Sequence, residues 1–201
     1  MKLNNKRGFT LIEVIVVAGI IAILAGILVP MIFNQIDESR ITRAQADVKS
    51  TATAILAFRK DTGKWPSFSA GTYPCNSPAN GGDASVISIL NSDGKSPSIT
   101  GAGWADITTS LRYNLLFQEN PTTKGNNCYP NPVNQASTGW KGPYLTSYQS
   151  DPWGNQYIIN SADFEIQGNG VWVISAGPDG IVQTGALENS LVGDDIGVKV
   201  K

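Results

Sequence analysis

The sequence predicts an α+β chain in which one long N-terminal helix packs on a small antiparallel sheet, with a loop-rich insertion between them. Three observations support this fold class. An apolar run over residues 14–33 continues without interruption into an amphipathic pattern that reaches residue 62. Residues 67–139 are rich in Gly, Pro, Ser and Asn, as loops are. Short runs of β-branched and aromatic residues, typical of strands, follow from residue 156 onward.

The apolar run over 14–33 contains no charged side chain. Its length of about 20 residues is what a helix needs to cross a hydrocarbon core of about 30 Å. Basic residues precede it and acidic residues follow, so we expect the first residues to lie in the cytoplasm and the bulk of the chain outside. A secretory signal peptide is cleaved after its apolar core. Here the candidate junction, Gly8-Phe9, precedes the core, so cleavage would leave the membrane helix on the mature chain.

Two residues distinguish this segment from a plain membrane anchor. Pro30 lacks an amide N–H and clashes with the preceding turn, which predicts a kink or local unwinding over 26–30. Glu13 places a carboxylate at the cytoplasmic end of the run. A charge at the centre of a membrane helix costs roughly 2.5–3.5 kcal/mol, and less near the interface. We therefore expect a partner that compensates Glu13.

Beyond the membrane, apolar residues recur every three or four positions up to residue 58, with charged residues between them. Gly63 and Pro66 then supply a C-terminal glycine and a residue that cannot continue a helix. The predicted organisation has four parts: a leader over 1–8, a membrane helix over 9–33, its amphipathic half over 34–62, and a globular domain over 63–201.

Within the globular domain the insertion covers about 67–139, and the sheet and tail cover 140–201. Apolar spacing predicts short helices over 83–90 and 105–118 of the insertion. Three short runs, over 156–159, 164–166 and 171–174, are bounded by turn residues and predict an antiparallel meander packed on the helix.

Composition excludes several classes of function. The net charge is −1 and the basic residues form no stripe, so a nucleic-acid partner is not expected. Histidine is absent, which removes the commonest general base and metal ligand, and we do not expect an enzyme. The two cysteines, Cys75 and Cys128, form no CxxC motif. Both lie in the insertion, where one disulfide would stabilise the fold by roughly 2–4 kcal/mol; two free thiols are the alternative.

The segment Gly8-Phe9-Thr10-Leu11-Ile12-Glu13-Val14 resembles the prepilin signal of type IV pilins and type II secretion pseudopilins. That resemblance implies a type IV pilin-like fold and a chain that prepilin peptidase cleaves between Gly8 and Phe9, after which Phe9 is N-methylated. It also implies a homopolymer built through the N-terminal helices. In it Glu13, the fifth residue after the cut, pairs with the amino terminus of a neighbouring subunit. Such a buried pair fixes the register of docking more than it adds affinity. The kink or unwinding expected from the chemistry of Pro30 would lie within this assembly helix.

A second segment, Asp151-Pro152-Trp153-Gly154-Asn155-Gln156-Tyr157, has the residues of a tight turn followed by packing aromatics. It also resembles the corresponding segment of the major pseudopilin of type II secretion. The resemblance implies a subunit of a pseudopilus that drives protein export, with minor pseudopilins and an inner-membrane assembly platform as partners. The chain would be a single-pass inner-membrane protein with its C-terminal domain in the periplasm.

Two alternatives remain open at the level of the sequence. One is a type IV pilin of a surface filament for adhesion, motility or DNA uptake. The other, from a different class, is a membrane-tethered extracellular binding module whose aromatic-rich insertion recognises a ligand.

The tail combines carboxylates and glycines without histidine or cysteine, a composition that suits a hard cation such as calcium. An acidic, solvated loop is the simpler interpretation. The resemblance to the major pseudopilin implies calcium, although residues 181–187 are more apolar than that family's pattern. The ligands implied are Asp179 and Asp194, then Asp195 and a carbonyl of Ala176, with Glu188 or Asn189 as substitutes for intermediate ligands.

Overall fold

The computed structural model describes residues 8–67, 89–105, 111–112, 139–145, 147 and 149–201. The chain forms two compact units, Met1–Arg40 and Ile41–Lys201. One helix, α1 (Leu11–Thr62), begins in the first unit and ends in the second. Each unit is described by itself below.

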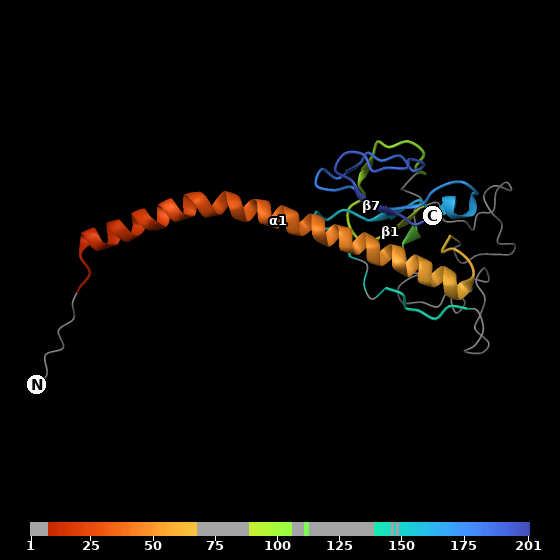
Figure 1. Cartoon of the computed structure of the whole chain (residues 1–201), viewed down its shortest axis with the longest axis horizontal. Coiled ribbons are helices and arrows are strands. Elements are labelled where there is room, and N and C mark those ends of the chain that lie inside the picture. The colour runs from red at the N-terminus through yellow and green to blue at the C-terminus, as the bar shows by residue number, and fades with distance from the viewer. Residues whose placement is uncertain (1–7, 68–88, 106–110, 113–138, 146, 148) are drawn as a thin grey trace, which may run out of the picture. The chain divides into compact units, whose positions relative to one another are not determined.

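In the first unit the described chain is almost entirely α1, and every residue from Gly8 to Arg40 is exposed. By length and composition α1 is apolar enough to cross a membrane. The helix runs without interruption through Gly26 and Pro30 (Figure 1), so the chain does not unwind there in this structure. A kink at Pro30, the other predicted outcome, stays a prediction. A proline removes one backbone hydrogen bond. The turns on both sides, residues 26–29 and 31–34, keep their helical conformation.

In the second unit α1 buries one face, as the amphipathic pattern predicted. Ala44, Val48, Ile55 and Phe58 are all at most 2% exposed, at spacings that place them on the same side of the helix. The helix ends at Thr62, and Gly63 follows with φ 73°. Its N–H donates to the carbonyl of Arg59 at 2.8 Å, which confirms the predicted C-terminal glycine.

The main sheet has five strands in the order β3-β1-β4-β5-β7. Their bounds are β1 Leu90–Asn91, β3 Leu111–Arg112, β4 Ile158–Ile159, β5 Trp172–Ser175 and β7 Ile196–Lys199. Neighbouring strands from β1 to β7 are antiparallel, and only β3 pairs in parallel, with β1. A second sheet pairs β2 (Ser98–Ile99) with β6 (Ile181–Val182) in parallel. The predicted α+β layout, a long helix on a small and mainly antiparallel sheet, is confirmed.

Three predicted elements differ from the structure. The run over 164–166 is not a strand, because residues Ser161–Glu165 form a 3₁₀ helix, η4, that directs Phe164 into the core. Leu90, predicted to end a helix, lies in β1 opposite Ile159. Residues 111–112, predicted as helix, form β3. In both cases pairing with a distant strand overrides the local helical spacing. The remainder of the predicted helices, 83–88, 106–110 and 113–118, lies outside the described residues.

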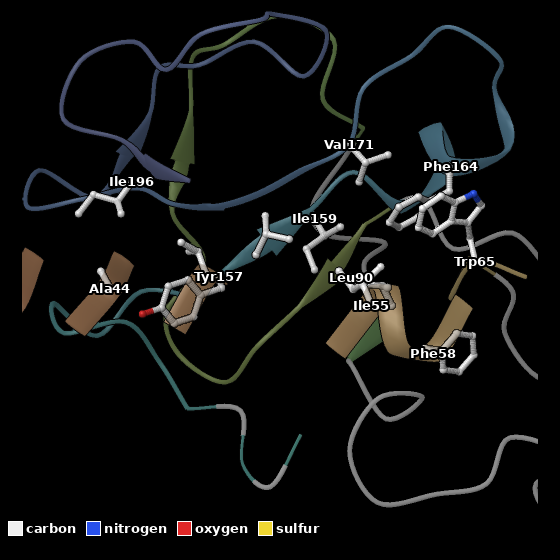
Figure 2. Close-up of a cluster of buried hydrophobic side chains, with 12 residues drawn as sticks. Ala44, Ile55, Phe58, Trp65, Leu90, Tyr157, Ile159, Phe164, Val171 and Ile196 are labelled. Atoms are coloured by element: carbon white, nitrogen blue, oxygen red, sulfur yellow. The ribbon is translucent and has the colours of Figure 1, made fainter. Parts of the chain in front are cut away.

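The core lies where α1 meets the sheet. Figure 2 shows one cluster of buried side chains, to which α1, η4 and the strands β1, β4, β5 and β7 contribute. At its edge Trp65 stacks on Phe164 with ring centroids 4.4 Å apart, and the guanidinium of Arg59 covers Trp65 at 3.8 Å. A second cluster, which includes Ile158 and Ile174, fills the space between the sheet and the tail.

Candidate functional site

The N-terminal junction is open to the surroundings. Gly8 is exposed, and the side chain of Phe9 is 86% exposed. The helix begins two residues after Phe9, so the Gly8-Phe9 bond lies in non-helical chain that a peptidase can bind in an extended form. This placement agrees with a processing site at that bond, whose cleavage remains a prediction.

Glu13 lies in the first turn of α1, three residues after Thr10. One of its carboxylate oxygens accepts from the N–H and from the hydroxyl of Thr10, each at 3.4 Å. This is one half of a capping box, in which an acidic side chain binds back to a free amide at the helix start. The sequence analysis missed this role of Thr10, although the Thr-x-x-Glu spacing was a signal for it.

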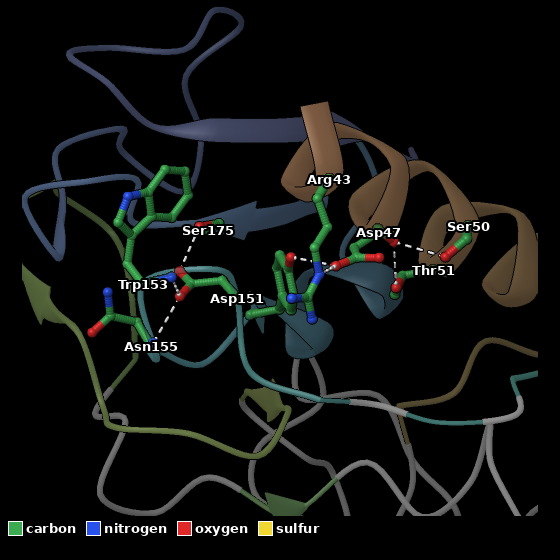
Figure 3. A network of polar contacts seen from close by, with 9 residues as sticks. Arg43, Asp47, Ser50, Thr51, Asp151, Trp153, Asn155 and Ser175 are labelled. Atoms are coloured by element: carbon green, nitrogen blue, oxygen red, sulfur yellow. Dashed lines mark hydrogen bonds and ion pairs between the residues drawn. The ribbon is translucent and has the colours of Figure 1, made fainter. Parts of the chain in front are cut away.

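A rigid turn is built around Asp151, whose side chain is 2% exposed (Figure 3). One oxygen accepts from the backbone N–H groups of Trp153 and Asn155, at 3.0 and 2.7 Å. The other accepts from the hydroxyl of Ser175 on β5 at 2.7 Å. A buried carboxylate is stable when its oxygens are hydrogen-bonded in this way. The predicted turn is confirmed, and its aromatic residues Trp153 and Tyr157 pack against the core.

The predicted calcium ligands Asp179, Asp194 and Asp195 all lie in the acidic tail, where a hydrogen bond joins the first two. Asp194 accepts from the N–H of Asp179 at 3.2 Å, which connects the two loops. One oxygen of Asp195 accepts from the N–H groups of Gln183 and Thr184, at 2.9 and 2.6 Å. Burial, partly offset by these hydrogen bonds, raises the pKa of Asp195.

Two buried oxygens in this loop lack a hydrogen-bond partner among the described residues: Oδ1 of Asp195 and Oε1 of Gln183. Buried acceptors are normally satisfied, so this pair fits a hard cation that takes oxygen ligands. Among the described residues no three Asp, Glu, His or Cys side chains come close enough to hold a metal ion. A cation here would therefore need amide and backbone carbonyl oxygens as well. The sequence analysis did not single out Gln183.

The remaining predicted ligands lie in different surroundings. The ammonium of Lys199 donates to Oδ1 of Asn189 at 2.7 Å and to the carbonyl of Glu188 at 3.1 Å. Asn189 and Glu188 thus bind Lys199, and no described contact joins either of them to Asp179 or Asp194. Ala176 is fully buried in the second core cluster. Cys75 and Cys128 lie outside the described residues, and their disulfide remains a prediction.

One polar network escaped the sequence analysis. Asp47, on the buried half of α1, accepts from the hydroxyl of Tyr157 at 2.9 Å and forms an ion pair with Arg43 at 3.6 Å (Figure 3). Helical spacing places Arg43 and Asp47 on one face, i and i+4, but only the folded chain brings Tyr157 to them.

Two family models match the chain. The prokaryotic N-terminal methylation motif matches residues 3–29, and the type II secretion system protein G model matches residues 105–194. The first covers the exposed junction with Glu13, and the second covers the Asp151 turn and the acidic tail. The N-terminal segment of the chain is thus similar to the methylated N-termini of one family, and the C-terminal segment is similar to protein G of type II secretion.

Individual relatives agree with these two matches. The type II secretion system core protein G of Pseudomonas aeruginosa is 37% identical over 71 residues, which are 35% of this chain and 50% of that protein. The core protein G of Escherichia coli is 23% identical over 90% of this chain and 88% of that protein. The fimbrial protein Q of Moraxella bovis is 29% identical over 71% and 96%. The first of these matches spans about half the length of the relative. No solved structure matches the chain.

Proposed function

We propose that this chain is a structural subunit that polymerises through its N-terminal helix into a pseudopilus for type II secretion. The observation that supports it most is the combination of two features in one chain. The exposed prepilin-type junction leads into an apolar helix with no buried residue in the first unit, and the C-terminal half matches protein G. A subunit whose largest apolar surface is unburied needs lipid or other copies to cover it.

The proposal extends to topology and partners. The leader lies in the cytoplasm, the helix crosses the inner membrane once, and the C-terminal domain lies in the periplasm. Prepilin peptidase removes residues 1–8 and Phe9 is methylated. Minor pseudopilins and an inner-membrane assembly platform complete the machine. The chain acts as a structural component rather than an enzyme, and none of the names of its relatives denotes an enzyme.

Glu13 provides the sharpest test. In the assembled fibre its carboxylate exchanges its weak contacts with Thr10 for the amino terminus of a neighbour. Glu13→Gln retains an acceptor for the capping contact but removes the charge. We expect normal processing to a mature start at Phe9, measured by mass spectrometry, together with loss of fibres and of secretion. Glu38→Gln, an exposed acid farther along α1, is the matched control.

Wild-type amounts of fibre and secreted protein from Glu13→Gln would show that this carboxylate does not direct assembly. The match to fimbrial protein Q supports the alternative of a surface pilus. That alternative predicts that deletion of the gene removes surface filaments and leaves secretion intact, whereas a pseudopilin deletion abolishes secretion.

We also propose that the acidic tail binds calcium. Asp179 and Asp194 would hold the ion, assisted by Asp195 and the side-chain oxygen of Gln183, with a carbonyl of Ala176 as predicted from the family resemblance. The ion would neutralise carboxylates that the loop gathers and so fasten 177–184 to 193–195. Its support is the pair of buried oxygens without partners and the contact between Asp194 and Asp179.

Ligand binding to the folded state alone stabilises it, by about 2.7 kcal/mol at a concentration of one hundred times Kd. The full chain in detergent should therefore melt at a higher temperature in calcium than in chelator. Asp194→Asn should lose most of this difference, while Asp93→Asn, an exposed acid outside the tail, should keep it. Equal melting temperatures of the wild type in calcium and in chelator would overturn the calcium proposal without affecting that of filament assembly.

A further inference from the structure

A polar groove of about 430 Å³ lies beside the Asp151 turn and has no role in the function proposed above. It is lined by Lys95, Ser96 and Ser98, on the segment that leads into β2, and by residues 178–181, which lie beside that segment. Trp153 and Asn155 of the turn complete the lining. A volume in this range is that of a small-molecule site rather than of a gap between side chains.

The backbone holds each wall in place. The N–H of Lys95 donates to the carbonyl of Gly154, and the N–H of Gln156 donates to the carbonyl of Lys95, both at 2.9 Å. A Cβ on Gly94 would lie 2.8 Å from the carbonyl carbon and oxygen of Asn155, so the two segments are in close contact. On the other side the N–H of Ser98 donates to the carbonyl of Gly180 at 3.1 Å. The groove is therefore preorganised, which lowers the entropic cost of binding.

Several polar groups in the lining of this groove have no hydrogen-bond partner in the described part of the chain. Lys95, Ser98 and the amide group of Asn155 make no side-chain hydrogen bond or ion pair within the described part of the chain. The indole N–H of Trp153 likewise has no partner there. Figure 3 shows Trp153 and Asn155 projecting from the same turn, whose backbone Asp151 fixes. The indole of Trp153 packs in part against the core and also lines the groove, so an aromatic ring and unused donors and acceptors lie together on a rigid support.

We propose that this groove binds one or two residues of a neutral carbohydrate. A pyranose ring offers C–H groups that stack on an indole and a rim of hydroxyls that both donate and accept. Lys95 and the Asn155 amide would donate to these hydroxyls, and Ser98 and the amide oxygen of Asn155 would accept from them. An anion is disfavoured because the carboxylate residue Asp179 also lines the groove, and an apolar ligand would leave these polar groups unpaired.

The site differs from the proposed calcium loop. The carboxylate oxygens of Asp179 accept from the N–H of Ile181 at 2.7 Å and from the amide of Gln183 at 2.6 Å, and each retains a lone pair for the proposed calcium ion. Asp179 also lines the groove, but the carbohydrate contacts come from Lys95, Ser98, Trp153 and Asn155. The proposal consequently does not depend on the assembly of a filament.

The test uses the full chain in lauryldimethylamine oxide, a detergent without a sugar headgroup, in buffer with calcium. Saturation-transfer difference NMR would be recorded with maltose, cellobiose and N,N′-diacetylchitobiose, and with sorbitol as a polyol that lacks a ring face. We expect transfer to at least one disaccharide, a Kd on the order of 1 mM, and none to sorbitol. Asn155→Ala should weaken binding about tenfold and Lys95→Ala by a smaller factor. Lys49→Ala, an exposed lysine on α1, is the matched control.

Both groove substitutions remove solvent-facing groups, so unchanged thermal unfolding should accompany the loss of binding. The proposal is overturned if no disaccharide receives saturation from the wild type, or if Asn155→Ala and Lys49→Ala bind equally. It is also overturned if Asn155→Ala abolishes fibres in cells while no sugar binds, because the groove would then be a contact between subunits.

Discussion

Tyr144 shows how a single side chain fastens the segment 139–145 to the end of α1. Its hydroxyl donates to Oδ2 of Asp61 at 3.0 Å and accepts from the N–H of Lys141 at 2.9 Å. Its ring contacts Phe58 edge-on, with centroids 5.7 Å apart. Burial raises the pKa of Tyr144 to about 12, and the hydrogen bond to Asp61 acts in the same direction.

This pKa shift predicts a pH dependence of stability in alkali. The folded state holds the proton more tightly than the unfolded chain, whose tyrosine titrates near pH 10. The stabilisation is therefore complete below pH 10 and is lost as the pH rises through about 12. Equilibrium unfolding between pH 9 and pH 12 should show a steeper loss of stability for the wild type than for Tyr144→Phe. Parallel profiles of the two proteins would contradict this assignment.

At the scale of elements, the second half of α1 is joined to β4 by polar as well as apolar contacts. Val48 and Ile55 pack in the core cluster that also contains Ile159. Beside them, Asp47 accepts a hydrogen bond from the hydroxyl of Tyr157, the residue immediately before β4. This hydrogen bond fixes the rotation of the helix on the sheet, which apolar contacts alone specify less well.

Tyr157→Phe should consequently destabilise the second unit by about 1 kcal/mol, the usual contribution of one hydrogen bond. The ring remains to fill the core, so no cavity adds to the loss. Chemical denaturation of the full chain in detergent would measure the change. In the Asp47→Asn background the same substitution should lower the free energy of unfolding by less, because the charge that strengthens the hydrogen bond is gone. An equal loss in both backgrounds would indicate that the hydroxyl does not act through Asp47.

For the whole molecule, all buried residues of the described chain lie in the second unit. The first of them is Ala44, and residues from Gly8 to Arg40 are exposed throughout. The stability of the second unit should thus not depend on the first, because burial of apolar surface dominates folding.

A chain that begins at Ile41 should unfold with a free energy within about 0.5 kcal/mol of that of the full chain, the scale of changes that leave a core untouched. A chain that begins at Gly63 should fail to fold, because it lacks Val48, Ile55 and Phe58. Calorimetry and circular dichroism of the two truncated chains would measure this. A large loss of stability on removal of residues 1–40 would contradict it.

Much of the fold follows from local patterns. The course of α1, its buried face and its glycine stop were predicted from spacing and capping residues, because these signals act within a few positions of one another. The turn at Asp151 was predicted in the same way from its Asp-Pro and Gly-Asn pairs. The predictions of a helix ending at Leu90 and of a strand over 164–166 were wrong, because the deciding contacts of Leu90 and Phe164 come from distant parts of the chain. At Pro30 the helix continues, so the local unwinding is absent from this structure.

The sequence by itself determined the prepilin-type junction, the carboxylate of Glu13 and the apolar helix, since each is a property of consecutive residues. Only the tertiary structure decided which polar groups meet. It joins Tyr157 to Asp47 and Ser175 to Asp151 by hydrogen bonds, and it buries the unpaired oxygens of Gln183 and Asp195 in the tail. The physical reason is that hydrogen bonds depend on distances of about 3 Å between atoms that chain topology brings together. No local spacing encodes that proximity.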